Sequence, residues 1–311
     1  MIKKVNIIIL NYNGHKDTIA CFKSLQKITY QNYDVIIVDN DSPDKSMDKI
    51  IEYMKNNDID YDFYLSPGDA MCETSVTSKV HLIQSGENKG YGHGNNIGIK
   101  YALQNNADYI LVLNNDTIVT PDFLEPMVTM CENDKNIGIA SGKILFYDKP
   151  DTIWFNGGSY SPCTAKVKHF NFNEKDIGQV PKEPITFISG CMWLIPRKTF
   201  EKVGYINEDY FMYVEDLEFC QRVLKNNLLL NISTSAIVYH KAGSSAGGHL
   251  SEFSIYWMAK NKIKFIKNNI NIACRLYSYF YNTIVLSLRW IYKSEIKLFL
   301  SHIKGIKDAI K

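Results

Sequence analysis

The chain has 311 residues, of which 45% are hydrophobic and 22% are charged. These are ordinary values for a globular protein, so disorder is not the default expectation, and the length allows one large domain or two modest ones. The seven cysteines are scattered without a C-x-x-C pair, which argues for a reducing compartment and against a disulfide or zinc framework. No apolar window is long enough to predict a membrane span. The N-terminal apolar run is too short and wrongly flanked for a signal peptide.

The net charge of +2 is distributed unevenly along the chain. Residues 255–311 hold eleven Lys and Arg against two Asp and Glu, a net charge of +9, whereas the remainder holds 24 against 31, a net charge of −7. A basic, aromatic tail on a near-neutral or acidic body is informative about partners.

The first elements predict a parallel sheet. Apolar strands are expected over 5–10 and 33–39, and between them Ile19, Phe22 and Leu25 recur at helical spacing. A strand, a helix and a strand at this spacing form a βαβ unit. The first strand ends in Asn11-Tyr12-Asn13-Gly14 and the second in Asp39, so these polar residues should face one crevice at the carboxyl edge of the sheet.

The chain then alternates between regular and irregular segments. A helix is expected around 46–54, an irregular excursion or insertion over 58–79, and a strand over 79–84. The segment ENKGYGHGNNIG (87–98) leads into a helix expected over 96–104. It fails the dinucleotide fingerprint because Asn95 stands where the third glycine is required. Such glycine-rich turns suit a close approach to phosphate, and equally a tight loop that needs positive φ.

The stretch YILVLNNDT (109–117) is an apolar strand that ends in Asn114, Asn115 and Asp116. Ligands bind at such strand ends in open α/β sheets, and a carboxylate held there can bind a divalent cation. The alternative is an Asx turn that caps the next helix.

The second half continues the alternation. A helix is expected over 121–131, a strand over 137–146, a turn over 154–158, and loops to about 184. The apolar segment 186–196 predicts a strand bent at Ser189-Gly190, followed by a short helix over 197–203. A helix over 215–226 and a strand over 228–239 complete the body, which closes on the segment HKAGSS (240–245).

Two further groups could take part in chemistry. Glu215 and Asp216 open a helix, where acids usually complement the helix dipole, but five acids crowd residues 208–218, more than a dipole role needs. A carboxylate such as Asp216 could serve as a general base. His240, at a strand end, is a plausible metal ligand, although a hydrogen-bonded structural histidine is the alternative.

The tail segments SIYWMAKNKIKFIKNN (254–269) and ACRLYSYFYNTIVLSLRWIYK (273–293) mix aromatic, aliphatic and basic residues at helical spacing. They predict amphipathic helices that lie on an anionic membrane surface. The alternative is that they pack on the body with solvated lysines.

Six stretches together resemble family 2 glycosyltransferases of the GT-A fold, in the bacterial branch that includes rhamnosyltransferases. They are IIILNYNG, IIVDNDS, ENKGYGHGNNIGI, ADYILVLNNDTIVTPDFLE, ISGCMWLIPRKTFEKVGYINEDYFMYVEDLEFCQRVLKNN and VYHKAGSS, in family order from about Val5 to Ser245. The resemblance implies a mostly parallel, Rossmann-like sheet flanked by helices, with the amphipathic tail helices appended. It implies a catalytic domain over 1–250, with a nucleotide-binding half to about 117 and an acceptor-binding half after it, and a tail over 251–311.

The resemblance also implies roles for particular residues. Asp216 would be the catalytic base of an inverting transfer, Glu215 and Trp193 would bind the acceptor, and Asp116 with His240 would hold Mg²⁺ or Mn²⁺. The expected contacts to the nucleotide-sugar are Asn11, Tyr12, Asn13, Asp39, Asn88, Gly90, Asn95, Asn114 and Asn115. Asn114 departs from the family by replacing the first acid of its Asp-x-Asp motif, which removes one anionic metal ligand.

The implied function is transfer of rhamnose or another hexose from a dTDP- or UDP-sugar to a glycan or lipid-linked hydroxyl during surface polysaccharide assembly. The enzyme would work on the cytoplasmic face of the plasma membrane, bound peripherally, without a nucleic-acid partner, and a homodimer is retained as an option. Two rival functions are a non-catalytic sugar-nucleotide-binding assembly protein and a sugar nucleotidyltransferase.

Overall fold

The apolar runs of the sequence form a ten-stranded sheet in the computed structural model, which describes residues 2–72, 78–242 and 251–310. The strand order is β3-β4-β2-β1-β5-β11-β7-β12-β6, and β8 pairs with β7 outside this path. The strands of this sheet are β1 (Val5–Asn11), β2 (Tyr33–Asp39), β3 (Asp62–Tyr64), β4 (Val80–Gln84), β5 (Tyr109–Asn114), β6 (Thr117–Val119), β7 (Ile137–Phe146), β8 (Ile153–Phe155), β11 (Met192–Pro196) and β12 (Leu229–His240).

The sheet is mostly parallel, as the sequence and the family resemblance predicted. From β3 to β5 all neighbours are parallel, and their continuous apolar runs are those of strands buried on both faces. β11 enters antiparallel between β5 and β7, and β12 lies parallel to β7. β5, β7 and β12 therefore run in one direction, and their carboxyl ends share one edge of the sheet with those of β1, β2 and β4.

Helices cover the sheet of the body. They are α1 (His15–Leu25), α2 (Ser46–Asn56), α3 (Pro67–Cys72), α4 (Tyr91–Gln104), α5 (Leu124–Asn133), α6 (Arg197–Val203) and α7 (Glu215–Lys225). α4 lies close against β1 because Gly98 faces Ile8, and a Cβ atom at Gly98 would stand 2.7 Å from Ile8 Cγ2. The chain moves outward from β1 to β2 and β4, then returns over α4 to β5 on the other side of β1. Such a reversal leaves a crevice at the strand ends, where open α/β sheets bind ligands.

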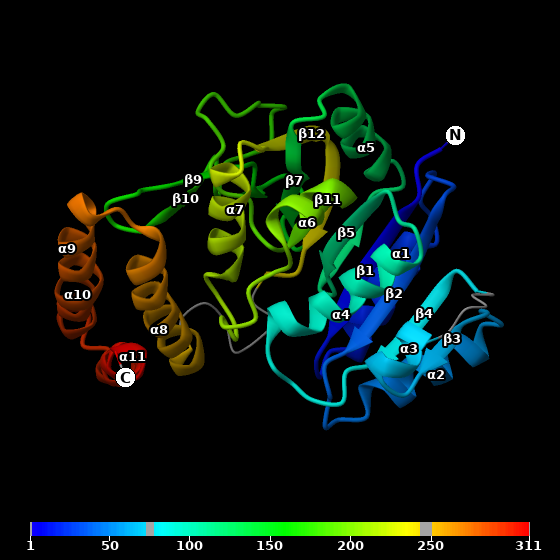
Figure 1. Ribbon diagram of the computed structural model, residues 1–311, viewed down its shortest axis with the longest axis horizontal. Coiled ribbons are helices and arrows are strands. Elements are labelled where there is room, and N and C mark those ends of the chain that lie inside the picture. The colour runs from blue at the N-terminus through cyan, green and yellow to red at the C-terminus, as the bar shows by residue number, and fades with distance from the viewer. Residues whose placement is uncertain (1, 73–77, 243–250, 311) are drawn as a thin grey trace.

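The tail forms a group of helices at one end of the molecule, with α2 and β3 near the other (Figure 1). Its elements are α8 (Glu252–Asn269), α9 (Ile272–Phe280), the π-helical turn η1 (Tyr281–Val285), α10 (Leu286–Tyr292) and α11 (Ile296–Ile310). α11 packs tightly on α8, since a Cβ atom at Gly305 would stand 2.4 Å from the carbonyl oxygen of Tyr256. No helix among the described residues is both long and apolar enough to cross a bilayer.

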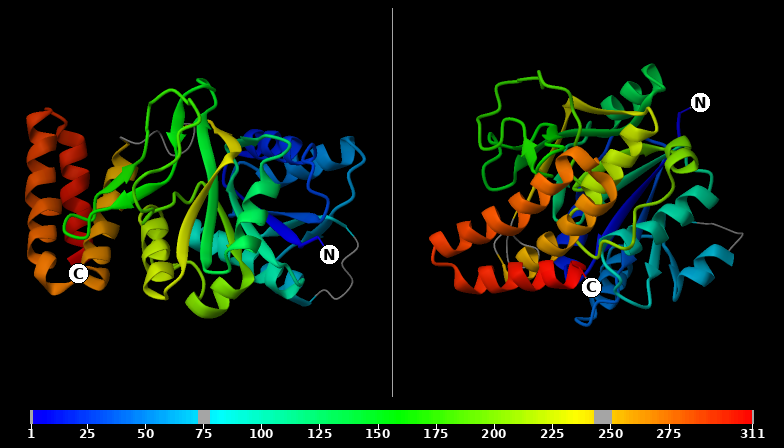
Figure 2. Two further views of the ribbon diagram at one scale, coloured as in Figure 1. Left: turned by 90° about the horizontal axis from the view of Figure 1, so that it is seen from above. Right: turned by 60° about the vertical axis from the view of Figure 1, so that its left-hand side comes forward.

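A β-hairpin joins the body to the tail. β9 (Gly158–Tyr160) and β10 (Val167–His169) form a small antiparallel sheet, and its loop reaches toward the tail helices (Figure 2). A disulfide connects Cys163 in this loop to Cys274 in α9. The sequence argued against a disulfide framework and did not predict this single bond. Its cysteines are 111 positions apart in the chain, so no local spacing could reveal them.

Several expected boundaries are also corrected. The segment 58–79 is not wholly irregular: β3 joins the sheet edge parallel to β4, and α3 follows, while 73–77 lie outside the described residues. The expected turn at 154–158 contains the end of β8 and the start of β9, and the strand expected over 186–196 begins only at Met192. α4 starts five residues earlier than expected and α5 three residues later. The Gly-Ser stretch after Ala242 lies outside the described residues.

Candidate active site

The polar ends of β1 and β2 form one hydrogen-bonded network. Asn11 donates from Nδ2 to Asp39 Oδ1 at 2.5 Å, and Ser42 donates to Asp39 from both its hydroxyl and its backbone N–H, at 2.7 and 3.0 Å. Gln84, at the end of β4, donates to Asp39 Oδ2 at 3.1 Å. Both oxygens of Asp39 are thus held by neighbouring groups, as a buried carboxylate requires.

This network continues to Asn115, the residue after β5, and the residues that follow Asn11 in the chain remain open to a ligand. Thr18 Oγ1 donates to Asn11 Oδ1 at 2.7 Å, and Asn115 Nδ2 donates to Thr18 Oγ1 at 3.1 Å. Asn11 is fully buried, whereas Tyr12 is 47% exposed and Asn13 is also exposed. A ligand in the crevice would therefore meet Tyr12 and Asn13 first, with Asn11 and Asp39 beneath them.

The turn before α4 is held by its own asparagines. Asn88 Oδ1 accepts from the Gly90 N–H and from Asn40 Nδ2, both at 3.0 Å. Gly90 has φ +98°, and a Cβ atom there would stand 2.0 Å from the carbonyl oxygen of Phe211, so glycine is required on two grounds. Asn95 is buried, and its Oδ1 has no hydrogen-bond partner among the described residues.

Asp116 and His240 meet at the carboxyl edge. Thr117 pairs with His240 across β6 and β12, and His240 Nε2 lies 3.2 Å from Asp116 Oδ1. Both side chains are nearly buried, and the Trp154 ring packs edge-on against His240 with 4.4 Å between centroids. His240 Nδ1 is buried without a hydrogen-bond partner in the described part of the chain. Asn114 lies partly exposed just before them, at the end of β5.

This pair fits a divalent cation. Two ligands at right angles, each about 2.1 Å from one ion, would stand about 3 Å apart, close to the spacing observed here. A carboxylate oxygen with an imidazole nitrogen suits Mn²⁺, and the oxygen also suits Mg²⁺. No cluster of three or more His, Cys, Asp or Glu is found in the described ranges that could hold a metal. The remaining ligands would have to come from solvent and from a bound phosphate.

Glu215 and Asp216 follow a strained turn. Tyr213 and Val214 have φ of +69° and +73°, a conformation that residues other than glycine rarely adopt, β-branched valine least of all, and that is concentrated at functional sites. α7 begins directly afterwards, and Asp216 accepts from the Leu217 N–H at 2.8 Å. Gly190, just before β11, offers its N–H to the other Asp216 oxygen at 3.5 Å. The turn and helix start therefore fix the direction of this carboxylate.

Burial separates the acidities of the two carboxyl groups. It raises the pKa of Asp216 to about 6, against backbone hydrogen bonds and the Lys262 charge, which oppose the shift. Burial and the neighbouring Asp216 charge raise the pKa of Glu215 well above its usual range, and Glu215 Oε2 has no hydrogen-bond partner among the described residues. At neutral pH this favours an ionised Asp216, able to accept a proton, beside a protonated Glu215.

Tyr91 connects the two halves of the site and was not predicted from the sequence. Its hydroxyl donates to the Gly190 carbonyl oxygen at 2.6 Å. Burial raises its pKa well above the usual range, and the charges of Glu215, Asp216 and Asp116 raise it further. A Cβ atom at Gly190 would stand 3.3 Å from the Tyr91 hydroxyl oxygen and 3.5 Å from Asp216 Cβ, so Tyr91 and the proposed base meet at this glycine.

Trp193, which was expected to bind the acceptor, has a structural role instead. Trp193 is fully buried in the sheet, where its indole N–H donates to the Ile188 carbonyl oxygen at 3.1 Å and its ring packs on Phe219. It cannot reach an acceptor in this structure, so that expectation is corrected. Within the acidic window, Glu208 bonds to α4 through Asn96 and His93, and the other two acids pair with lysine or arginine.

A second unpredicted residue, Asn261 of α8, supports the turn before Glu215. Its Nδ2 donates to the carbonyl oxygens of Met212 and Tyr213, both at 2.9 Å, and the side chain is buried. The first tail helix is thereby attached to the backbone that presents Asp216. No local pattern marks this asparagine, because its partners lie 48 and 49 positions away.

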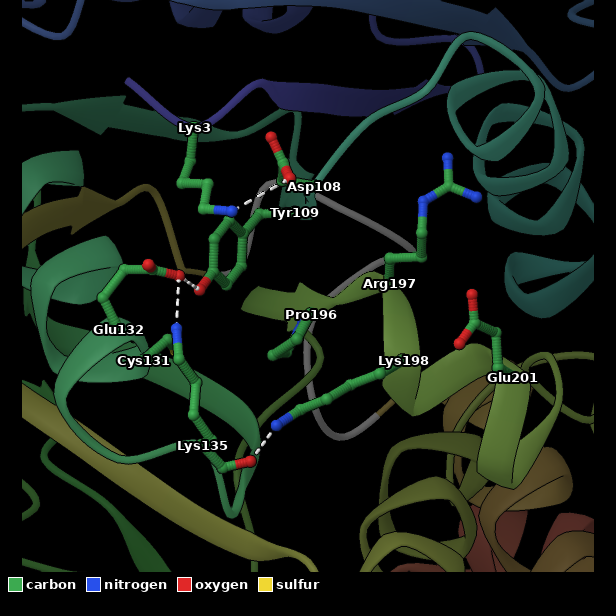
Figure 3. A pocket seen from close by; sticks show the side chains of 10 residues that line it. All are labelled: Lys3, Asp108, Tyr109, Cys131, Glu132, Lys135, Pro196, Arg197, Lys198 and Glu201. Carbon is green, nitrogen blue, oxygen red and sulfur yellow. Dashed lines mark hydrogen bonds and ion pairs between the residues drawn. The ribbon is translucent and has the colours of Figure 1, made fainter. Parts of the chain in front are cut away.

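A shallow pocket lies at the opposite end of the sheet (Figure 3). Lys3 and Tyr109 stand at the amino ends of β1 and β5, and the charged groups there pair with one another, as in the Lys3–Asp108 and Glu132–Lys135 contacts of 3.4 and 2.8 Å. It shares no residue with the carboxyl-edge site. We therefore place the candidate site at the other edge.

Comparison with solved structures shows that the fold is that of GT-A glycosyltransferases. The chain superposes with a TM-score of 0.58 on a mannosyltransferase from Pyrobaculum calidifontis in complex with GDP-Man and Mn²⁺, at 12% identity, over 100% of this chain and 76% of that one. It superposes on GalNAc-T7 with UDP, GalNAc and Mn²⁺ with a TM-score of 0.66, at 17% identity, over 96% and 54%. At such identities the similarity concerns the fold alone.

The chain belongs to glycosyl transferase family 2, whose sequence model matches residues 6–204. It is 25% identical to the low-salt glycan biosynthesis hexosyltransferase Agl10 of Haloferax volcanii over 271 residues, 84% of this chain and 75% of the relative. It is 24% identical to the dTDP-rhamnosyl transferase RfbF of Shigella flexneri over 327 aligned residues, 100% and 97%. The Escherichia coli rhamnosyltransferase WbbL is 24% identical over 193 residues, 58% and 72%. The resemblance to the rhamnosyltransferase-containing branch is confirmed.

Proposed function

We propose that the protein is a metal-dependent inverting hexosyltransferase that uses a dTDP- or UDP-sugar, with rhamnose as the first donor sugar to test. The observation that carries the proposal is the pairing of Asp116 with His240 at the carboxyl edge of the sheet, where Asp216 is held at the start of α7 by the Leu217 and Gly190 N–H groups. Family membership favours transfer over nucleotidyl chemistry. The relatives RfbF and WbbL support rhamnose as the sugar.

In the proposed reaction, Asp216 removes the proton of an acceptor hydroxyl. The hydroxyl oxygen bonds to the anomeric carbon of the donor as the bond from that carbon to the diphosphate oxygen breaks, so the configuration inverts. Asp216 is suited to this role because its pKa of about 6 leaves it ionised at neutral pH. Glu215 beside it would then bind the acceptor as a neutral acid.

Asp116 and His240 would hold Mg²⁺ or Mn²⁺ beside the donor diphosphate. When bound, the cation neutralises charge on the departing diphosphate. The donor would be held by the strand-end groups of β1, β2 and β5 and by the turn before α4, through Asn11, Tyr12, Asn13, Asp39, Asn88, Gly90, Asn95, Asn114 and Asn115. The body would divide near residue 117 into donor and acceptor halves, and the tail would begin near residue 251.

The test is a transfer and hydrolysis assay with dTDP-rhamnose and the UDP-hexoses, with Mn²⁺, with Mg²⁺ and with EDTA. We expect turnover of one donor, its loss in EDTA and in Asp116→Asn, and inversion at the anomeric carbon by NMR. Retained configuration would contradict the mechanism, and full activity in EDTA would contradict the metal role. If a donor bound but was not turned over, a non-catalytic sugar-nucleotide-binding assembly protein would be the better assignment.

We also propose that the helical run α9–η1–α10 lies on an anionic bilayer, which would place the enzyme peripherally on the cytoplasmic face. Exposed apolar side chains recur every four residues along this run, and their exposed fractions are 77% for Ile272, 81% for Leu276, 53% for Phe280, 50% for Ile284 and 58% for Leu288. Residues 255–311, which include this run, have a net charge of +9, which complements anionic lipid.

Co-sedimentation with phosphatidylglycerol vesicles tests the membrane proposal. Leu276→Glu with Leu288→Glu should abolish binding, whereas Leu229→Glu, at an exposed leucine on β12, should not. A second copy of the chain is the other candidate occupant of this face. Concentration-dependent dimers that the double variant dissociates, together with unchanged vesicle binding, would favour it and exclude the bilayer.

A further inference from the structure

We propose that Trp257 and Asn261 of α8 are positioning residues for the transfer reaction. They hold residues 211–214, the strap, which joins the turn before α4 to the start of α7. The inference rests on the proposed function, in which that turn holds the donor and Asp216 is the base. It goes beyond that function, in which the tail only contacts a bilayer. The family model ends at residue 204, so it assigns nothing to the strap or to α8.

The first observation is that one face of α8 holds the strap. Trp257 and Asn261 are four positions apart, so their side chains lie on the same face of the helix. The Trp257 ring stacks on the Phe211 ring, with 4.7 Å between centroids and 24° between planes. Asn261 Nδ2 donates to the carbonyl oxygens of Met212 and Tyr213, both at 2.9 Å, and the residue is only 1% exposed. α8 therefore contacts three successive residues of the strap.

The second observation is that the strap supports the turn before α4. The Phe211 carbonyl oxygen accepts from the Tyr91 N–H at 2.8 Å. A Cβ atom at Gly90 would stand 2.0 Å from the same oxygen and 2.7 Å from Phe211 Cα, so the turn lies directly on the strap backbone. Asn88 fixes the Gly90 N–H from within the turn, at 3.0 Å. A displacement of Phe211 would therefore displace the turn that is proposed to hold the donor.

The third observation is that the strap ends at the proposed base. Its last two residues, Tyr213 and Val214, both have positive φ, and such strained backbone persists where the surrounding structure holds it. The Tyr213 carbonyl group, which Asn261 bonds, belongs to the peptide that joins these two residues. The Val214 carbonyl oxygen accepts from the Glu218 N–H at 2.9 Å, and Asp216 lies in the helical turn between them. Asn261 therefore holds the strained peptide that sets the direction of Asp216.

The strap is thus a common support for the donor turn and the base. In Figure 1 the segment that enters α7 runs between α8 and the start of α4. α8 is itself held from its other side by α11, because the Tyr256 hydroxyl donates to Asp308 at 3.0 Å and Gly305 lies against the Tyr256 backbone. A misplacement of about 1 Å between reacting groups can cost about a hundredfold in rate, so a fixed strap matters for catalysis.

The first test is hydrogen–deuterium exchange of the full-length protein, followed in peptides that cover residues 88–94 and 205–217. Asn261→Leu removes the amide donor and keeps a side chain of similar size. We expect exchange in both segments to become about tenfold faster or more, the effect of losing a buried hydrogen bond, while β1, β2 and β5 exchange as in the wild type. Asn268→Leu is the matched control, because it makes the same change at an exposed position on the same helix.

Three outcomes of the exchange experiment would overturn the proposal. They are faster exchange in 205–217 alone, equal changes in Asn268→Leu, and an equal rise throughout the sheet, which would mean that Asn261 only stabilises the fold. Trp257→Leu is the second variant, because Trp257 is only partly buried and its replacement tests the same contact if Asn261→Leu does not fold. It should accelerate exchange in both segments, and Trp257→Phe, which keeps a stacked ring, should restore the wild-type pattern.

The second test is steady-state transfer with the same variants. Asn261→Leu and Trp257→Leu should lower kcat by about tenfold to a hundredfold, by more than they raise either KM, and Trp257→Phe should recover the wild-type kcat. A lower melting temperature with an unchanged kcat would show a purely structural role and would overturn the proposal. If the wild type transferred no sugar, the proposed function would fail, whereas the exchange experiment would still decide whether α8 positions the strap.

Discussion

Asp216→Asn should separate catalysis from folding, because the substitution removes a charge and retains the shape. Asp216 has its pKa raised from 3.8 to about 6 by burial. A difference of about two units corresponds to about 3 kcal/mol between the two protonation states. Ionised Asp216 therefore costs the folded protein up to about 3 kcal/mol at pH 7, and the neutral asparagine should recover part of this amount.

The pH dependence follows from the direction of the shift. The folded protein binds the Asp216 proton more tightly than the unfolded chain between about pH 4 and pH 6. The contribution of Asp216 to the free energy of unfolding therefore falls as the pH rises through that window, and it is lost above the folded-state pKa. Asp216→Asn should lack this fall, so the stability difference should be small at pH 4 and largest above pH 6.

As the pH rises, turnover should increase while the Asp216 contribution to stability falls. In the wild type, kcat should rise with pH through an apparent pKa near 6 as Asp216 ionises. Asp216→Asn should lower kcat by about 10²- to 10⁴-fold, the range for loss of a general base, and should leave the affinity for dTDP or UDP within a few-fold.

The assays are urea denaturation from pH 4 to 8, steady-state transfer over the same range, and calorimetric nucleotide binding. Asp209→Asn is the matched control, since Asp209 lies in the preceding loop with its side chain 69% exposed and paired with Lys264. A variant that keeps wild-type turnover would refute the assignment of the base. A less stable variant with lost nucleotide binding would show instead that Asp216 supports the fold.

Three shorter predictions concern the groups around the base. Asn261→Ala should lower the free energy of unfolding by about 1–3 kcal/mol, because two buried carbonyl oxygens lose their donor. The variant should also reduce the rate of single-turnover transfer. Lost stability with an unchanged transfer rate would exclude a positioning role for Asn261. Gly90→Ala should abolish nucleotide binding or folding, because its Cβ would clash with Phe211. Gly86→Ala is the control, since Gly86 is also at positive φ but has open space around it, and it should show only the backbone strain. Equal effects of the two variants in binding and melting assays would refute the clash. His240→Ala should raise the Mn²⁺ concentration for half-maximal activity about tenfold or more, and an unchanged Mn²⁺ titration would exclude it as a ligand.

The sequence by itself determined the parts that depend on short-range pattern. Continuous apolar runs predict strands buried on both faces, and the polar residue that ends each run marks where it leaves the sheet. The strand ends at Asn11, Asp39 and Asn114 could therefore be located, with Asp116 and His240 beside their own strands. Helical periodicity likewise located the start of α7 at Glu215 and the amphipathic character of the tail.

Only the tertiary structure decided which distant segments meet. The insertion of β11 between β5 and β7, the Cys163–Cys274 bond and the support from Asn261 all join residues far apart in the chain, where no local spacing exists to be read. Burial was undetermined for the same reason: Trp193, expected to bind the acceptor, lies fully inside the sheet. The charge state of a carboxylate depends on what surrounds it in space, so the acidity of Asp216 follows from the packing of α7, α8 and the Gly190 turn.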